Sequence, residues 1–85
     1  MSTMIEKQKL DIGAIRAELG LDRDELGRDA NVDQTRISRI ESGQVISRQT
    51  ALRVFYAINR FRVKKGLPEL TWNEDEWNIT LGKHK

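Results

Sequence analysis

The feature that most constrains this chain is a helix-start pattern that occurs twice, eleven residues apart. In the first copy, residues 21–26, Asp22 stands at the N-cap position and Glu25 follows three residues later, as in a capping box. In the second copy, residues 32–37, Asp33 takes the N-cap position. Each cap lies between two apolar residues at the spacing of a hydrophobic staple. The pattern predicts two short helices joined by a tight turn, over residues 22–31 and 33–42.

Gly27 lies in the middle of the first of these helices. A glycine there costs about 0.5–1 kcal/mol relative to alanine. Because a short turn forces the two helices to cross closely, we interpret Gly27 as a packing residue. The alternative is a glycine that is merely tolerated in a loose helix.

Two further helix starts flank this pair. Asp11 precedes apolar residues at helical spacing, and Gly20 marks the end of that helix. Ser47 is placed to cap a longer helix that should run to about Lys65 and stop at Gly66. The apolar stripe of this longer helix consists of Ala51, Val54, Phe55, Ile58 and Phe61.

The C-terminal part of the sequence allows two interpretations. The run Thr71-Trp72-Asn73-Glu74 has the spacing of another capping box and predicts a short fifth helix over residues 71–78. A hairpin folded about residues 73–76, which would pair Trp72 with Trp77, is the alternative. We expect the two tryptophans to close the core, with a dimer surface that also uses Ile79 and Leu81 as the other option. Residues 79–85 are expected to form a frayed tail.

The helix predicted over residues 33–42 has one polar face without an acid. At 100° per residue, Ile37 and Ile40 point toward the core, and Arg36 lies on a flank. The opposite face carries Gln34, Thr35, Ser38 and Arg39. Amide, hydroxyl and guanidinium groups are the side chains that bind base edges in the major groove. We therefore interpret this face as a DNA-reading surface rather than an ordinary solvated one.

Charge is distributed unevenly along the chain, although the net charge is only +2. Residues 34–65 contain eight Arg or Lys and one acid, whereas residues 18–33 contain six acids and two arginines. This separation favours a basic surface that faces a polyanion. The alternative is that the charges only solvate helix faces. The acidic run at residues 74–76 is expected to lie away from the groove face.

The composition excludes several classes of function. The chain has no cysteine, and its one histidine is His84, near the end of the sequence. No set of His, Asp and Glu has metal-ligand spacing and no glycine loop is built to hold phosphate, so we expect no enzyme activity, no cofactor and no metal. No apolar run reaches the roughly 20 residues that span a bilayer. The expectation is a cytoplasmic, nucleoid-associated protein that does not bind membranes.

Residues 12–58 resemble the Cro/phage-repressor-type helix-turn-helix family, often called XRE, most specifically in the run Ile37-Ser38-Arg39-Ile40-Glu41-Ser42-Gly43. The resemblance continues in Ile12-x-x-Ile15-Arg16, in Gly20-Leu21-Asp22-x-x-Glu25-Leu26-Gly27 and in Ser47-Arg48-Gln49-Thr50-Ala51-Leu52. It implies an all-α fold: a five-helix bundle with a central helix-turn-helix, of the lambda-repressor-like DNA-binding type. We expect a single domain over residues 1–85, with its family-like core at 11–65.

The resemblance also implies roles for individual residues. The helix over 33–42 enters the major groove, where the base-reading residues are Gln34, Thr35, Ser38 and Arg39. Contacts to the DNA backbone are expected from Arg16, Arg23, Arg36, Ser42, Gln44 and Arg48. Arg16 and Glu41 match positions that pair within the domain, so this pairing is the alternative role of Arg16. The chain departs from the family where Arg23 replaces a glutamine and Asn31 replaces a turn glycine.

The expected function is that of a sequence-specific, double-stranded-DNA-binding transcriptional regulator that acts as a repressor. A homodimer on DNA is expected because one short helix offers few contacts to bases. The alternative is an antitoxin or another protein-binding regulator with autoregulatory DNA binding, whose protein partner would be a toxin or an anti-repressor.

Overall fold

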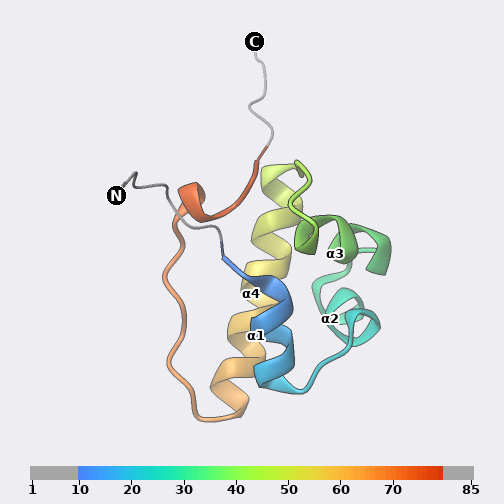
Figure 1. Cartoon of the computed structure of the whole chain (residues 1–85). Helices are drawn as coiled ribbons and strands as arrows, with labels where there is room; N and C mark the ends of the chain where they lie inside the picture. The colour runs from blue at the N-terminus through green and yellow to red at the C-terminus, as the bar shows by residue number, and fades with distance from the viewer. Residues whose placement is uncertain (1–9, 80–85) are drawn as a thin grey trace, which may run out of the picture.

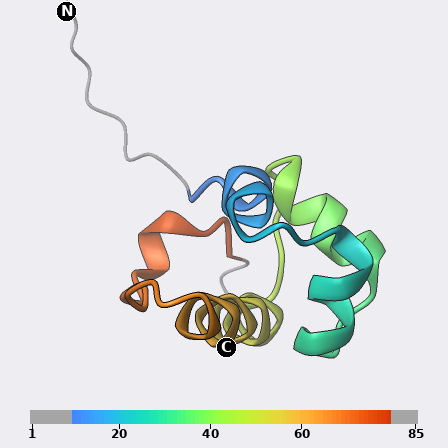
Figure 2. The ribbon, with the colours of Figure 1, turned by 90° about the horizontal axis from the view of Figure 1, so that it is seen from below.

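A computed structural model describes residues 10–79, and this part of the chain is all-helical. It contains four α-helices and one short 3-10 helix: α1 (Ile12–Leu19), α2 (Arg23–Ala30), α3 (Gln34–Glu41), α4 (Arg48–Lys64) and η1 (Glu74–Glu76). Figures 1 and 2 show α1 lying against α4, with α2 and α3 on one side of this pair. Residues 66–79, which we call the C-terminal strap, return along the other side.

The predicted caps are present at all four α-helices. Asp22 and Glu25 form the reciprocal capping box, in which each carboxylate accepts a hydrogen bond from the backbone N–H of the other residue. Asp11, Asp33 and Ser47 each accept a backbone hydrogen bond at the start of their own helix. The predicted helix boundaries therefore hold to within about one residue, because capping side chains fix them.

The core lies where α4 meets α1, α2 and α3. The buried side chains of its centre, none of them more than 2% exposed, are Ile12, Leu26, Ile37, Ala51, Val54, Ala57 and Ile58. The stripe predicted on the long helix is confirmed, since four of its five residues are buried and Phe61 packs against them partly exposed.

The turn between α2 and α3 depends on close contact of its backbone with Gly27. A Cβ atom on Gly27 would lie 2.7 Å from the carbonyl oxygen of Val32 and 3.5 Å from the backbone nitrogen of Gln34. Asn31 adopts the left-handed conformation that ends α2, with φ of 62°. Its amide side chain tolerates this conformation better than most residues do. The interpretation of Gly27 as a packing residue is confirmed.

The predicted fifth α-helix is not confirmed. In its place the strap contains only the single turn of η1, with Asn73 as its N-cap, and Thr71 and Trp72 are outside any helix. The two tryptophans explain the difference, because both rings pack on Phe55 and stack on each other, with centroids 5.6 Å apart. Residues five apart on an α-helix point about 140° away from each other, so a helix could not bring both rings to one place.

No hairpin forms either, although Trp72 and Trp77 do meet. Trp77 is 4% exposed, and Trp72 is partly buried against the core. The prediction that they close the core is confirmed. As a result, Trp77 is not available as part of an exposed dimer surface.

Hydrogen bonds fasten the strap to α4 and to the loop between α3 and α4. The buried side chain of Asn59 donates to the carbonyl of Leu70 and accepts from its N–H, at 3.1 and 2.8 Å. At the other end, Ile46 and Ile79 form a parallel β-bridge, and the amide side chain of Asn78 donates to the carbonyl of Gly43. Ile79 was predicted to be frayed and is instead part of the fold. The rest of the predicted tail lies outside the described residues, as does Leu81.

Replacing Gly27 with alanine tests the tight turn. The added methyl group must move a backbone carbonyl, so Gly27→Ala is expected to lower the free energy of unfolding by about 1–3 kcal/mol. Urea denaturation followed by circular dichroism measures this. Gly13→Ala is the matched control, since its Cβ would meet nothing closer than 3.6 Å, and its stability should not fall. Equal stability of Gly27→Ala and the parent would contradict the argument.

Candidate nucleic-acid interface

The outward face of α3 carries the side chains predicted to contact bases. Gln34, Thr35 and Arg39 are exposed, whereas Ser38 is half-buried. Ile37 is fully buried on the opposite face and Ile40 is partly buried, so the predicted rotation of the helix agrees with its burial. The face that remains in contact with solvent carries an amide, a hydroxyl and guanidinium groups and no carboxylate.

The arginines of the described residues divide into two groups. Seven of the nine donate a hydrogen bond to an acceptor within the fold: Arg16, Arg23, Arg28, Arg48, Arg53, Arg60 and Arg62. Within residues 10–79, only Arg36 and Arg39 have no such partner, and both lie on α3. Two guanidinium groups without an internal acceptor are thus concentrated on the helix with the acid-free face.

Arg36 and Arg39 line an open hollow between α3 and the start of α4. Its other walls are formed by the loop residues Val45 and Ile46, by Ser47, which caps α4, and by Thr50 of α4. Val45 is 55% exposed there. The hollow therefore offers two cations beside a small apolar surface.

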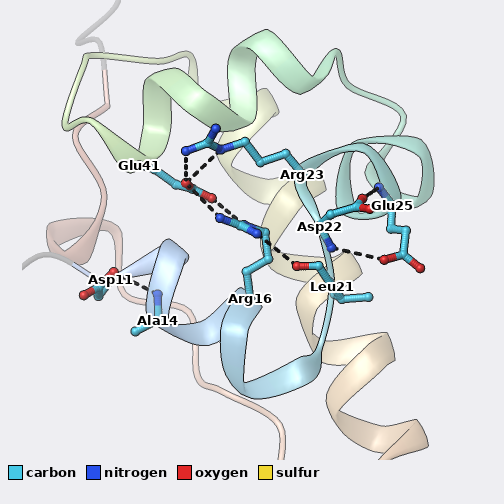
Figure 3. A network of polar contacts seen from close by, with 8 residues as sticks. All are labelled: Asp11, Ala14, Arg16, Leu21, Asp22, Arg23, Glu25 and Glu41. Atoms are coloured by element: carbon cyan, nitrogen blue, oxygen red, sulfur yellow. Dashed lines mark hydrogen bonds and ion pairs between the residues drawn. The ribbon is translucent and has the colours of Figure 1, made fainter.

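Glu41, at the end of α3, holds three elements together (Figure 3). Its carboxylate accepts hydrogen bonds from Arg16 of α1 at 2.7 and 3.3 Å and from Arg23 of α2 at 3.0 Å. Arg16 also donates to the carbonyl of Leu21, at 3.0 Å. Because the Glu41 side chain is only 10% exposed, these contacts fix the end of α3 relative to the first two helices.

The contacts of Glu41 change its acidity. Burial by itself acts to raise the pKa of Glu41, but the hydrogen bonds and positive charges of Arg16 and Arg23 outweigh burial and hold the pKa below its ordinary value of 4.5. The same hydrogen bonds raise the pKa of Arg16. Glu41 and Arg16 therefore remain charged at neutral pH.

The other residues expected at the DNA backbone surround α3. Arg23 is 47% exposed at the start of α2, where it lines an open hollow with Gln34. Ser42 donates to the carbonyl of Arg39, and Gln44 donates to Ser42, so both belong to the chain that leaves α3. Arg48 opens α4 and donates to Glu74 of the strap at 3.0 Å. This pairing brings one acid of the run at residues 74–76 to a residue expected to contact the DNA backbone.

Charge segregation along the sequence does not persist in space. Arg60 pairs with Asp29 on α2, and Arg62 pairs with Glu18 on α1, so basic and acidic segments of the sequence neutralise each other. Sequence reasoning missed these pairs, and it also missed the two hydrogen bonds of Asn59 to the backbone of Leu70, which we call the Asn59 clamp. The one available signal for Asn59 was an amide next to Ile58, four residues after Phe55 in the apolar stripe.

Two other features of residues 10–79 bear on function. They contain no group of three or more His, Cys, Asp and Glu side chains that could hold a metal ion. None of their helices has the length and apolar character needed to cross a membrane.

Comparison with known proteins gives one match. The sequence model of a family described as helix-turn-helix matches residues 12–56, which is more than half of the chain. No curated protein and no solved structure matches significantly. The matched region runs from the start of α1 into α4 and contains both helices of the tight-turn pair.

Glu41→Gln tests the shared carboxylate. It should lower the free energy of unfolding at neutral pH by about 1–3 kcal/mol, because charged hydrogen bonds are lost from a covered site. Since the folded pKa of Glu41 is depressed, this difference is present above pH 4.5 and disappears as the pH falls through the folded value. Urea denaturation of both proteins at pH 7 and pH 3 measures it.

Glu74→Gln is the control for this experiment. It removes an arginine-paired glutamate that is about half exposed, and exposed pairs contribute only about 0–1 kcal/mol. A Glu41→Gln difference that stays the same at both pH values would show that the ion pairs are not its source.

Proposed function

The chain belongs to the Cro/phage-repressor-type helix-turn-helix family of DNA-binding transcription regulators, and from this membership we propose that α3 enters the major groove of double-stranded DNA and reads its bases. The observation that carries the proposal is which arginines have a hydrogen-bond acceptor within the fold and which do not. The fold supplies an acceptor to every arginine in residues 10–79 except Arg36 and Arg39, and both belong to α3. An unpaired guanidinium on an exposed helix is available to phosphate oxygens or to guanine.

We assign the individual roles as follows. Gln34 and Arg39 are suited to bidentate contacts with adenine and guanine, while Thr35 and Ser38 can bond to either base. Arg36, on the flank of α3, contacts a phosphate. Arg23 and the chain leaving α3 support the same backbone contacts, and their positions around α3 agree with this role. The backbone contacts set position along the DNA, and the base contacts set sequence preference.

We further propose that two copies bind one operator. The helix α3 is only eight residues long, so the outward face of a single copy reaches only a few base pairs. Two copies on half-sites about 34–36 Å apart would double the base contacts and favour a palindromic site. Occupation of such a site near a promoter would repress transcription. The antitoxin alternative stays a prediction, and the charge pattern of α3 favours DNA as the main ligand.

Selection of binding sites from a random pool of DNA duplexes tests this function. We expect a palindromic consensus and two chains per duplex in sedimentation. Fluorescence anisotropy at increasing salt should show affinity falling, with a slope of about −0.9 per phosphate contacted. The absence of binding to any duplex at low salt would contradict DNA binding, and one chain per saturated site would contradict the dimer.

A comparison of two arginines tests the assignment of roles on α3. Arg39→Ala should change which bases are tolerated at one or two positions, by about 1–3 kcal/mol at the preferred base. Arg36→Ala is the matched control, because it removes an identical unpaired charge from the same helix. It should weaken binding to all DNA sequences equally and make the dependence of log affinity on log salt shallower by about one. Anisotropy on the selected site, its single-base variants and random DNA distinguishes the two effects. The reverse result would mean that α3 is rotated from the proposed orientation.

A further inference from the structure

Arg48 is expected to contact the DNA backbone, but in this structure its side chain is hydrogen-bonded to a carboxylate of the protein. Its Nε donates to an Oε1 of Glu74 at 3.0 Å, and its guanidinium carbon lies 6.0 Å from the centre of the Trp72 ring. Both partners belong to the strap, which the buried clamp of Asn59 and the stacked tryptophans hold in place. The carboxylate is therefore presented to Arg48 by a fixed part of the fold rather than by a loose chain.

The position of Arg48 puts this pair beside the proposed interface. Arg48 is the first residue of α4, directly after Ser47, which shares the hollow with Arg36 and Arg39. A phosphate that contacts the start of α4 would meet Arg48 and Glu74 together. The side chains of Arg48 and Glu74 are 56% and 47% exposed, so DNA can reach both.

The two arginine–glutamate contacts near α3 differ in their net charge. Glu41 is shared by Arg16 and Arg23, so this group of three retains one positive charge. Glu74 is paired with Arg48 alone, so this pair has a net charge of zero. Neutralisation of a DNA phosphate requires a net positive charge. Arg23 can supply this positive charge while it stays paired with Glu41, whereas Arg48 cannot do so while it is paired with Glu74.

We propose that Glu74 competes with a DNA phosphate for Arg48 and so limits the affinity of the protein for DNA. The inference rests on the proposed function. While Glu74 holds the Nε of Arg48, the pair contributes no net attraction for the duplex. Binding at this point requires the guanidinium to exchange Glu74 for the phosphate. Because the pair is exposed, breaking it costs little free energy, and Arg48 can still bind a phosphate.

This competition acts mainly on the sequence-independent part of binding. Arg48 is outside α3 and is not among the residues expected to contact bases. Removal of the carboxylate should therefore strengthen binding to random DNA and to the selected site by similar factors. The base preferences set by α3 should remain unchanged.

Glu74→Gln tests the proposal, with Glu69→Gln as the matched control. Glu69 is an exposed acid on the same strap, and no partner is assigned to it among the described residues, so both variants raise the net charge equally. Anisotropy is measured with random duplex DNA and with a selected duplex, from low to physiological salt. Glu74→Gln should bind both duplexes about three to ten times more tightly at low salt, with a salt slope steeper by about 0.9, whereas Glu69→Gln should change affinity less than twofold.

The double variant Arg48→Ala/Glu74→Gln shows whether the effect passes through Arg48. Its affinity should equal that of Arg48→Ala within the small change seen for Glu69→Gln. Thermal melting checks that each variant is folded.

Two results would overturn the proposal while leaving DNA binding intact. Glu74→Gln could bind no more tightly than Glu69→Gln, or it could bind more weakly than the parent, which would mean that Glu74 positions Arg48 for DNA. A failure of every protein, including the parent, to bind any duplex would instead overturn the proposed function together with this inference.

Discussion

The contact between Gly27 and the carbonyl of Val32 determines where α3 lies. With only hydrogen on Gly27, the backbone of the turn can approach α2 to a distance that no side chain permits. The left-handed Asn31 then reverses the chain within three residues, and Asp33 starts the next helix. The direction of α3 is thus fixed by backbone contact, and Glu41 fixes its far end against α1 and α2. A helix held at both ends can present polar side chains outward without depending on them for stability.

Ion pairs between different elements account for part of the charge on this fold. Acids of α1 and α2 pair with arginines of α4, and the strap supplies an acid to the start of α4. These contacts tie the outer surfaces of the helices together and neutralise three of the eight positive charges in residues 34–65. Among the arginines of residues 10–79, the two without an acceptor in the fold, Arg36 and Arg39, both lie on α3. The internal pairing of the other arginines therefore leaves these two guanidinium groups free on the helix that we propose to contact DNA.

The sequence predicted the helical part of this structure well, since its signals are local. An N-cap such as Asp22 or Ser47 acts within three residues of its own position, and an apolar stripe needs only the helical period. The rotation of α3 followed from Ile37 and Ile40, and the burial of both residues agrees with it.

The failures of prediction concern contacts between distant segments. The capping-box spacing of Thr71 and Glu74 predicts a helix over residues 71–78 of the strap. The stacking of Trp72 and Trp77 on Phe55 decides its conformation instead, and no local pattern encodes that packing. For the same reason, the partners of Arg48 and Arg60 could not be read from charge runs. The base and backbone roles on α3 remain predictions, since they concern a ligand and not the fold.

The two ends of the described chain meet at one place. The N–H of Leu10 donates to the carbonyl of Glu76 at 2.9 Å, next to the point where Ile46 bonds to Asn78. The entering chain, the departing chain and the loop after α3 are thus joined in one hydrogen-bonded cluster. A domain joined directly at residue 10 or at residue 79 would emerge at the same corner, close to the surface that we propose for DNA. Conversely, the proximity of these two positions makes residues 10–79 a good candidate for circular permutation, with a short linker joining them and new termini opened in a distant loop.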